Sequence, residues 1–354
     1  MAKAWEVLDT RSPILGNMAI VGAPYDDAKG DASGSAYIFA FDGTNWTQQA
    51  KLTGSDEVAF NNFGTGVAIS GNMALVGTPG DGPSNQYLGA VYVFTFDGTA
   101  WTQKAKLLAS VRDFNAEFGL CISLSGNTAL IGGTKAAYIF TFNGTVWTQQ
   151  AKLTSSDIQD TDYFGTAVSL SGQRALIGAY SAEFQGAAYV FDFDGTSWSQ
   201  EAKLVSLDIA GNDNFGKAVW LAGDLAIVGA PLKDHNKGAA YIFSSDGTTW
   251  SQTTKLTALG ARKADFFGTS VALPGTVALV GSQVSGGVPG VIYEYVLRRN
   301  VWTLGSQFLA SGGMNGDNLG VSLAFSGATL LAGADAASIG GIGQAYIFSL
   351  ARQH

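Results

Sequence analysis

The chain has 354 residues and a formal net charge of −8, and only 14% of its residues are charged. Because it has no basic stripe, it lacks the surface that binds nucleic-acid phosphates, so we expect no nucleic-acid partner. Its apolar runs are short and broken by Gly or Ser, which excludes a membrane-spanning segment of about 18 apolar residues. The 47 glycines and 12% aromatic residues indicate an all-β protein with many tight turns.

One segment of about 50 residues is repeated along the whole chain. A clear copy runs from Phe63-Gly64 through Ala74-Leu75-Val76-Gly77 and Ala90-Val91-Tyr92-Val93-Phe94 to Trp101-Thr102-Gln103. Four short β-patterned runs in such a period are typical of one propeller blade. The sequence therefore predicts an all-β, seven-bladed β-propeller of four-stranded antiparallel blades, forming a single domain over residues 1–354. The copies are expected at about 8–52, 63–107, 118–153, 164–204, 215–256, 267–309 and 319–350.

Within each copy, the first strand is expected to open at a Phe-Gly pair such as Phe63-Gly64. A Gly-centred link such as Ser70-Gly71-Asn72 leads into the second strand. The third strand carries a recurring tyrosine, and an Asp-Gly or Asn-Gly turn such as Asp97-Gly98 follows it. These dipeptides tolerate the positive φ of a hairpin turn, so a fourth strand is predicted from the next tryptophan, for example Trp101.

The tryptophan, tyrosine and lysine that recur in most copies allow two interpretations. A ring of aromatic side chains could stack on a ligand, but packing between sheets requires the same repetition, and we interpret the aromatics as packing residues. The lysines fall near the end of the fourth strand, where we expect them to protect an exposed sheet edge from aggregation. They are Lys51, Lys106, Lys152, Lys203 and Lys255.

The two ends of the chain complement each other. The seventh copy ends after Tyr346-Ile347-Phe348 without a tryptophan strand, whereas Ala2-Lys3-Ala4-Trp5-Glu6-Val7 precedes the first copy, which begins near Leu8. The sequence therefore predicts that the N-terminal strand at 2–7 completes the last blade and closes the ring.

The pairing of Phe215-Gly216 with Gly229-Ala230-Pro231 resembles the FG-GAP repeat of integrin α-subunit propellers and their bacterial relatives. This resemblance covers essentially the whole chain and implies an extracellular or cell-surface module for adhesion or recognition, often calcium-bound. Integrin-like members carry an aspartate-rich calcium loop between the first two strands. Here only Asp224 places a carboxylate in that link, and calcium needs six to eight oxygens, so integrin-type calcium sites and other cofactors are expected to be absent, apart from adventitious calcium. The sequence does not show a basic segment followed by an apolar core, so it gives no indication of a signal peptide in this chain.

The predicted strand order places the links after the second and fourth strands at one end of each blade, and the hairpins at the other. These links, here called the 2–3 loops and 4–1 loops, hold 18 of the 28 acids against seven bases, a net charge of about −11. The acids would attract cationic partners, unless they are solvated turn residues. Two clusters are candidate metal ligands: Asp157, Asp160 and Asp162 in one loop, and Asp26, Asp27 and Asp31 in another.

Aromatic residues that depart from the repeat suggest a ligand site in these loops. The 2–3 loop of the third copy is short, with six residues from Gly132 to Tyr138 against 15 from Gly77 to Tyr92, so we expect a notch beside taller neighbours. The alternative is that the aromatics pack beneath their own loops. The candidate ligand-binding residues are Tyr87, Phe114, Lys135, Tyr163 and Phe184.

Catalysis is not expected. The only histidines are His235 and His354, which leaves almost no base for a serine or cysteine nucleophile, and the single Cys121 falls at a small buried position. We therefore predict a monomeric, non-catalytic extracellular recognition or adhesion module that binds a protein partner through the 2–3 and 4–1 loops. A carbohydrate-binding lectin is the alternative, and a glycan-cleaving enzyme with a carboxylate pair is a third hypothesis.

Overall fold

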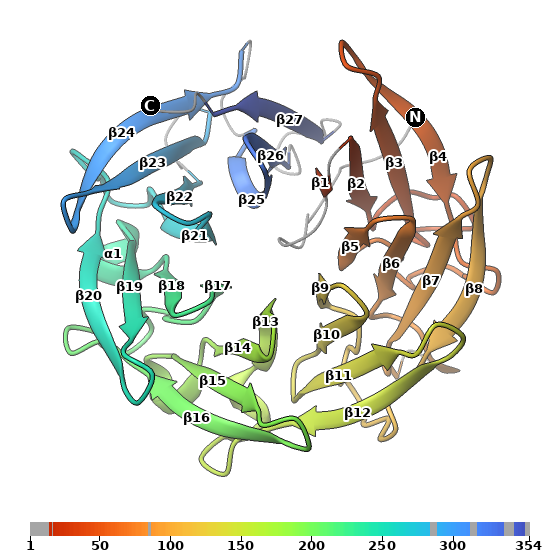
Figure 1. Ribbon diagram of the computed structural model, residues 1–354, viewed down its shortest axis with the longest axis horizontal. Coiled ribbons are helices and arrows are strands. Elements are labelled where there is room, and N and C mark those ends of the chain that lie inside the picture. The colour runs from red at the N-terminus through yellow and green to blue at the C-terminus, as the bar shows by residue number, and fades with distance from the viewer. Residues whose placement is uncertain are drawn as a thin grey trace. The chain divides into compact units, whose positions relative to one another are not determined.

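The computed structural model describes residues 14–15, 17–83, 86–283, 289–311, 317–335 and 343–350. They form seven antiparallel sheets, each built from strands that are consecutive in the chain (Figure 1). Six of these sheets have four strands, and the last has three within the described residues. The predicted all-β, seven-bladed propeller with four-stranded antiparallel blades is thus confirmed. The predicted N-terminal strand at 2–7 and the start of the first copy at Leu8 lie outside the described residues.

The chain divides into two compact units, and the first comprises Met1–Thr134, Tyr138–Gln150 and Ala324–His354. Its first two sheets are formed by β1 (Ile14–Leu15), β2 (Met18–Ala23), β3 (Ser35–Phe41) and β4 (Trp46–Leu52), and by β5 (Val67–Ser70), β6 (Met73–Thr78), β7 (Ala90–Phe96) and β8 (Trp101–Leu107). The third is formed by β9 (Cys121–Ser125), β10 (Thr128–Gly132), β11 (Ala137–Phe142) and β12 (Trp147–Leu153). Of the three-stranded sheet, β26 (Thr329–Ala334) and β27 (Gln344–Ser349) belong to this unit, whereas β25 (Leu319–Ser326) belongs to the second unit up to Leu323.

The second unit comprises Lys135–Ala137 and Ala151–Leu323. Its sheets are β13 (Phe164–Ser171), β14 (Arg174–Ala179), β15 (Ala187–Phe193) and β16 (Trp198–Leu204); β17 (Ala218–Ala222), β18 (Leu225–Ala230), β19 (Ala239–Ser245) and β20 (Trp250–Leu256); and β21 (Phe267–Ala272), β22 (Val277–Ser282), β23 (Val291–Arg298) and β24 (Val301–Leu309). Three short helical turns lie in the described loops of this unit: η2 (Asp160–Asp162), η3 (Ala182–Phe184) and α1 (Lys233–Asn236). No described helix is long and apolar enough to cross a membrane.

The repeated glycines bring neighbouring sheets into backbone contact. A Cβ placed on Gly77 would lie 1.9 Å from the carbonyl oxygen of Gly119 in the next copy, where no side chain fits. The same contact joins Gly229 to Gly268, at 2.0 Å. The glycine of the Gly-Ala-Pro run in one copy is therefore required by the Phe-Gly pair of the next copy, which is why the two elements recur together.

The Phe-Gly pair does not always open the first strand as predicted. Phe164 and Phe267 begin β13 and β21, but a register shift follows each of them. In the second sheet, β5 begins only at Val67, after Phe63 has made an isolated bridge to Gly34. The backbone kinks because the glycine of the pair adopts a positive φ, which is 101° at Gly64.

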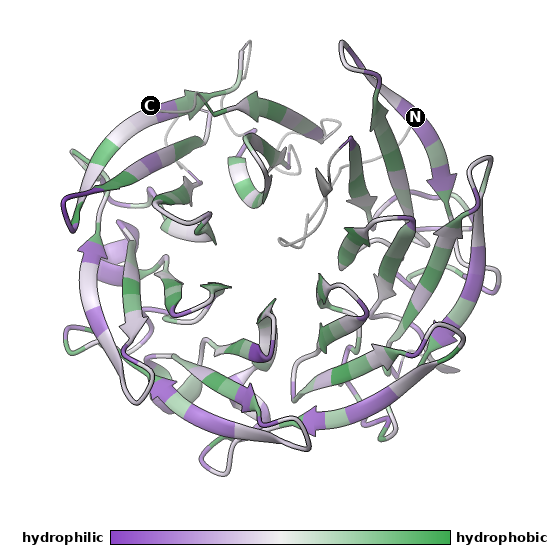
Figure 2. Cartoon of the chain, in the orientation of Figure 1, coloured by the Kyte–Doolittle hydropathy of each residue, from purple (hydrophilic) through white to green (hydrophobic). Residues whose placement is uncertain are grey.

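Aromatic packing accounts for the recurring tyrosines and tryptophans. Tyr92, Tyr189 and Tyr241 are fully buried. Trp101 stacks on Phe96 of its own sheet with ring centroids 5.4 Å apart. The packing interpretation of these residues is therefore confirmed. In Figure 2 the second and third strands are mainly hydrophobic, whereas β4, β8, β12 and β16 carry hydrophilic residues.

Candidate functional site

In the described part of the chain, the loops at one end of several sheets are joined by backbone hydrogen bonds. In the first unit, the amides of Phe60 and Asn62 donate to the carbonyl oxygens of Asp31 and Ala32, at 2.7 and 3.1 Å. In the second unit, Phe215 donates in the same way to Gln185, at 3.1 Å. These bonds connect a 2–3 loop to the 4–1 loop that follows it, so the loops form a fixed framework for their side chains.

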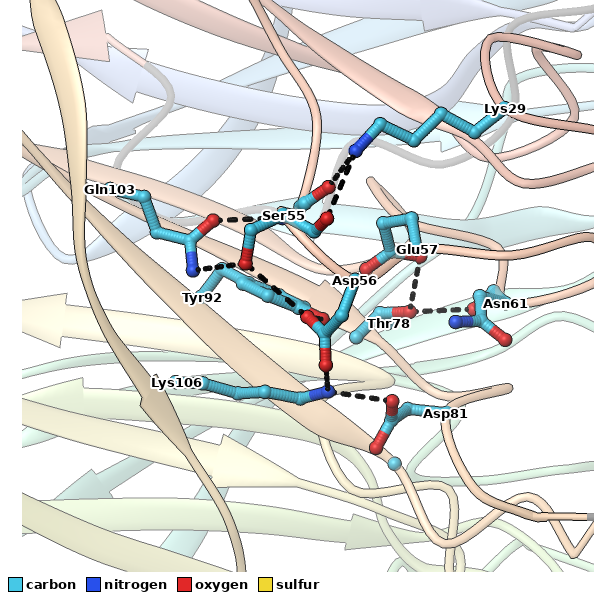
Figure 3. Close-up of polar contacts among 12 residues, drawn as sticks. Lys29, Ser55, Asp56, Glu57, Asn61, Thr78, Asp81, Tyr92, Gln103 and Lys106 are labelled. Atoms are coloured by element: carbon cyan, nitrogen blue, oxygen red, sulfur yellow. Dashed lines mark hydrogen bonds and ion pairs between the residues drawn. The ribbon is translucent and has the colours of Figure 1, made fainter.

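An ion-pair network lies between the loops of the second sheet (Figure 3). The Lys106 ammonium is 2.7 Å from Asp56 in a 4–1 loop and 2.8 Å from Asp81 in a 2–3 loop. The Tyr92 hydroxyl donates to Asp56 at 2.5 Å, and the ammonium also lies 5.0 Å from the centre of the Tyr92 ring. Burial would raise the pKa of Asp56, but the hydrogen bonds from Lys106 and Tyr92 lower it on balance. Arg112 extends the network by pairing with Asp81 at 2.9 Å.

This tyrosine–lysine–carboxylate network recurs because the strand register places each tyrosine opposite its lysine, as Tyr92 lies opposite Lys106. The equivalent ion pairs are Lys51–Asp26, Lys203–Asp157, Lys203–Glu183 and Lys255–Asp208. The ammonium groups of these lysines neutralise loop carboxylates in the structure, and their role in edge protection stays a prediction; they are Lys51, Lys106, Lys203 and Lys255. When these four lysine charges are included, the net charge of the loops becomes less negative and changes from about −11 to about −7.

The two predicted metal triads are engaged by the protein itself. Asp157 pairs with Lys203, Asp160 pairs with Lys135 at 2.8 Å, and Asp162 accepts a hydrogen bond from the Gln159 amide at 2.8 Å. In the other triad, Asp26 accepts from Ser35 and Tyr37 and pairs with Lys51, while Asp27 accepts from the Ala32 amide. Over the described ranges, no group of three or more acidic, histidine or cysteine side chains is placed to hold a metal ion, and neither triad, including Asp31, forms one.

Glu57 distinguishes the second sheet from the others. Its side chain is 6% exposed, and its Oε1 atom has no hydrogen-bond partner among the described residues. Oε2 lies 3.4 Å from the Thr78 hydroxyl, which donates a shorter bond of 2.8 Å to the Asn61 carbonyl. Burial raises the pKa of Glu57 to about 7, although the polar groups of Asn61 and Tyr92 oppose this rise. Figure 3 shows this carboxyl beside the ion-paired network.

Two of the predicted ligand-binding residues, Tyr87 and Phe114, belong to the first unit and lie on joined loops. Glu117 donates its amide to the Tyr87 carbonyl, and Asn115 donates to Gln86, both at 2.9 Å. The short 2–3 loop packs against the same segment, because the Thr134 amide donates to Ala116 at 2.9 Å. Phe114 is 62% exposed and Tyr87 is half-buried.

The other three, Lys135, Tyr163 and Phe184, belong to the second unit. Lys135 is paired with Asp160, so its charge is already compensated. Tyr163 stacks on Tyr180 with ring centroids 4.9 Å apart and remains 40% exposed. Phe184 is 83% exposed. Whether these five residues bind a ligand stays a prediction.

Exposed apolar side chains concentrate in the loops. Of the 16 large apolar residues that are exposed in the described part of the chain, 11 lie in 2–3 or 4–1 loops. They are Tyr25, Val58, Phe60, Leu108, Val111, Phe114, Tyr163, Phe184, Val205, Leu207 and Leu259. Several stand on left-handed backbone, with φ of 66° at Phe60, 56° at Tyr163 and 64° at Phe184, a conformation that is unfavourable for bulky residues. The loops thus hold apolar groups toward solvent at a conformational cost.

Sequence reasoning did not single out Glu57 or the residue Lys217 discussed below. For Glu57, a signal can be found by aligning the 14-residue segments that run from Lys-Leu to Phe-Gly in successive copies. Glu57 occupies the position of Ile158, Ile209 and Ala261 in three other copies and of Arg112 in the third copy, so a carboxylate stands where most aligned copies have an apolar residue.

Seven repeated antiparallel sheets with functional candidates confined to their loops define a β-propeller repeat protein. The family model for the FG-GAP repeat matches residues 14–39, 46–94, 101–140, 147–191, 198–243 and 250–293. The chain therefore belongs to the FG-GAP repeat family, as the Phe-Gly and Gly-Ala-Pro residues predict. A crystal structure of a protein from Lactobacillus plantarum is similar in fold, with a TM-score of 0.62 and 13% identity over 90% of this chain and 89% of the other. No curated protein matches the sequence.

Proposed function

We propose that the chain is a non-catalytic, extracellular recognition module that binds a protein partner through its 2–3 and 4–1 loops. The observation that supports this most directly is the concentration of exposed apolar side chains in loops that are fixed by backbone hydrogen bonds. Exposed aromatic groups on a preformed framework lose little conformational entropy on binding and supply most of the energy of many interfaces. The uncompensated loop acids would favour a partner with basic residues around its contact surface.

Site-specific photo-crosslinking tests this proposal. A photoreactive residue at Phe60, Phe114 or Phe184 is compared with one at Thr145 or Thr196, exposed positions in the hairpins at the other end of the sheets. On the surface of the producing cells, we expect one protein to be captured from loop positions and not from hairpin positions. The purified partner should then bind the unmodified chain and lose affinity when the loop aromatics are changed to serine. Equal capture from both ends would refute the proposal.

A carbohydrate-binding role is the second candidate, because the exposed rings of Phe114 and Tyr163 have the form of sugar-stacking platforms. A glycan array distinguishes it from the first: saturable binding of a defined glycan that depends on these rings would favour the lectin. Sustained release of sugar products would be needed for a glycan-cleaving enzyme.

A further inference from the structure

Three residues that are distant in the sequence meet in the second unit. The Tyr163 ring stacks on the Tyr180 ring at 4.9 Å, with an angle of 9° between the ring planes. The Lys217 ammonium lies 4.4 Å from the centre of the same Tyr180 ring. Two stacked phenol rings and a cation therefore form one continuous group at the loop end of β13, β14 and β17.

Each of the three residues departs from the repeat. At the position of Lys217 the other copies carry Thr65, Leu120, Thr166, Thr269 and Val321. At the position of Tyr180 they carry Pro24, Pro79, Thr134, Pro231, Gln283 and Asp335, and at that of Tyr163 they carry Asn62, Glu117, Asn214, Phe266 and Asn318. The shared fold does not require these three side chains, since the other blades are built without them.

Lys217 has no anionic partner among the described residues, unlike the lysines of the tyrosine–lysine–carboxylate network. Its side chain is exposed, yet the surrounding protein lowers its pKa through desolvation, with no carboxylate to oppose the effect. This combination describes an ammonium that is accessible to a ligand but poorly solvated. Such a group gains most from an incoming negative charge.

The neighbouring loops supply an apolar side chain. Phe184 follows Tyr180 in the same 2–3 loop and is 83% exposed. Its carbonyl accepts a hydrogen bond from the Asn212 amide, at 2.5 Å, in the 4–1 loop that leads to Lys217. An exposed phenylalanine and an unpaired ammonium on two loops joined by this hydrogen bond suit a peptide that presents a carboxylate and an apolar residue close together in its sequence. A sugar acid would leave the phenylalanine without a partner.

We propose that Tyr163, Tyr180 and Lys217 form a subsite for a carboxylate on a peptide segment of the protein partner, with Phe184 contacting an apolar neighbour of that carboxylate. This inference rests on the proposed function and specifies the chemistry of one contact. The carboxylate pairs with the Lys217 ammonium, and the exposed face of Tyr163 packs against the peptide beside it.

Peptide binding by the full chain tests the subsite. The probes are short peptides with a central aspartate flanked by leucine and phenylalanine, and identical peptides with asparagine, with affinity measured by fluorescence anisotropy. The variants Lys217→Thr and Tyr163→Asn place residues that other copies already carry, so both should fold. Lys104→Thr, at an exposed lysine on β8, removes the same charge elsewhere and serves as the matched control.

We expect the aspartate peptides to bind about tenfold or more tightly than the asparagine peptides, and Lys217→Thr to abolish this preference while Lys104→Thr retains it. Tyr163→Asn should weaken both peptides. Equal affinity for the two peptide series, or an unchanged preference in Lys217→Thr, would overturn the inference. Binding of oligogalacturonate but not of the peptides, with the same dependence on Lys217, would also overturn it and assign the site to acidic sugars. Loop-specific crosslinking at Phe60 and Phe114 would persist in either case, so failure of the subsite is distinguishable from failure of the proposed function.

Discussion

Glu57 should make the stability of the protein fall as the pH rises. Its pKa is about 7 in the folded chain, against an ordinary value of 4.5. Because the folded state holds the proton more tightly, the unfolding free energy decreases between these two pKa values and is constant above the higher one. A difference of about 2.5 pH units corresponds to about 3 kcal/mol, since each unit is worth about 1.4 kcal/mol.

The variant Glu57→Gln isolates this effect. The amide resembles the protonated carboxyl in shape and charge, so the variant and the wild type should have nearly equal stability at about pH 4. At about pH 8 the variant should be more stable by about 3 kcal/mol, because the wild type then buries an ionised carboxylate whose Oε1 atom has no partner among the described residues. Urea denaturation followed by tryptophan fluorescence at a series of pH values measures the difference.

Two further variants control the interpretation. Glu183→Gln makes the same chemical change at a glutamate that is exposed and ion-paired with Lys203, and it should not reproduce the gain in stability at about pH 8. Glu57→Ile installs the residue that Ile158 and Ile209 provide in other copies, and should remove the pH dependence as Glu57→Gln does. Parallel stability curves for the wild type and Glu57→Gln would refute the reasoning.

Two other predictions concern the shared fold. Gly77→Ala should destabilise the protein by more than about 3 kcal/mol, because the new Cβ would lie 1.9 Å from the Gly119 carbonyl oxygen. Gly71→Ala, in a left-handed turn with open space, should cost only about 1 kcal/mol in the same denaturation assay, and equal losses would contradict the backbone-contact argument. Lys106→Met should cost about 1–2 kcal/mol because it leaves the largely buried Asp81 with only Arg112 as its cationic partner among the described residues. The loss should decrease at low pH, as Asp56, whose pKa Lys106 lowers, is protonated; a loss that is independent of pH would count against the ion-pair network.

The architecture could be predicted because its causes lie within one repeat. Equivalent residues make the same packing contacts in nearly every blade, so one pattern is seen many times. Examples are Gly77, Tyr92 and Trp101. The loop chemistry could not be predicted in this way. Lys106 meets Asp56 and Asp81 across separations of 50 and 25 residues, and only the strand register and loop conformation decide that they meet.

Departures from the repeat therefore carry information of a different kind from the repeat itself. Residues that every blade needs are explained by packing, and their recurrence says little about what the molecule binds. A residue that one blade alone carries must be explained locally, either by drift or by a specific role. Drift would scatter such residues over the structure, whereas Tyr163, Tyr180 and Lys217 are separated by up to 54 positions and converge on one aromatic ring. Their convergence, on a loop that also carries an exposed phenylalanine, is the reason to seek the ligand of this propeller there.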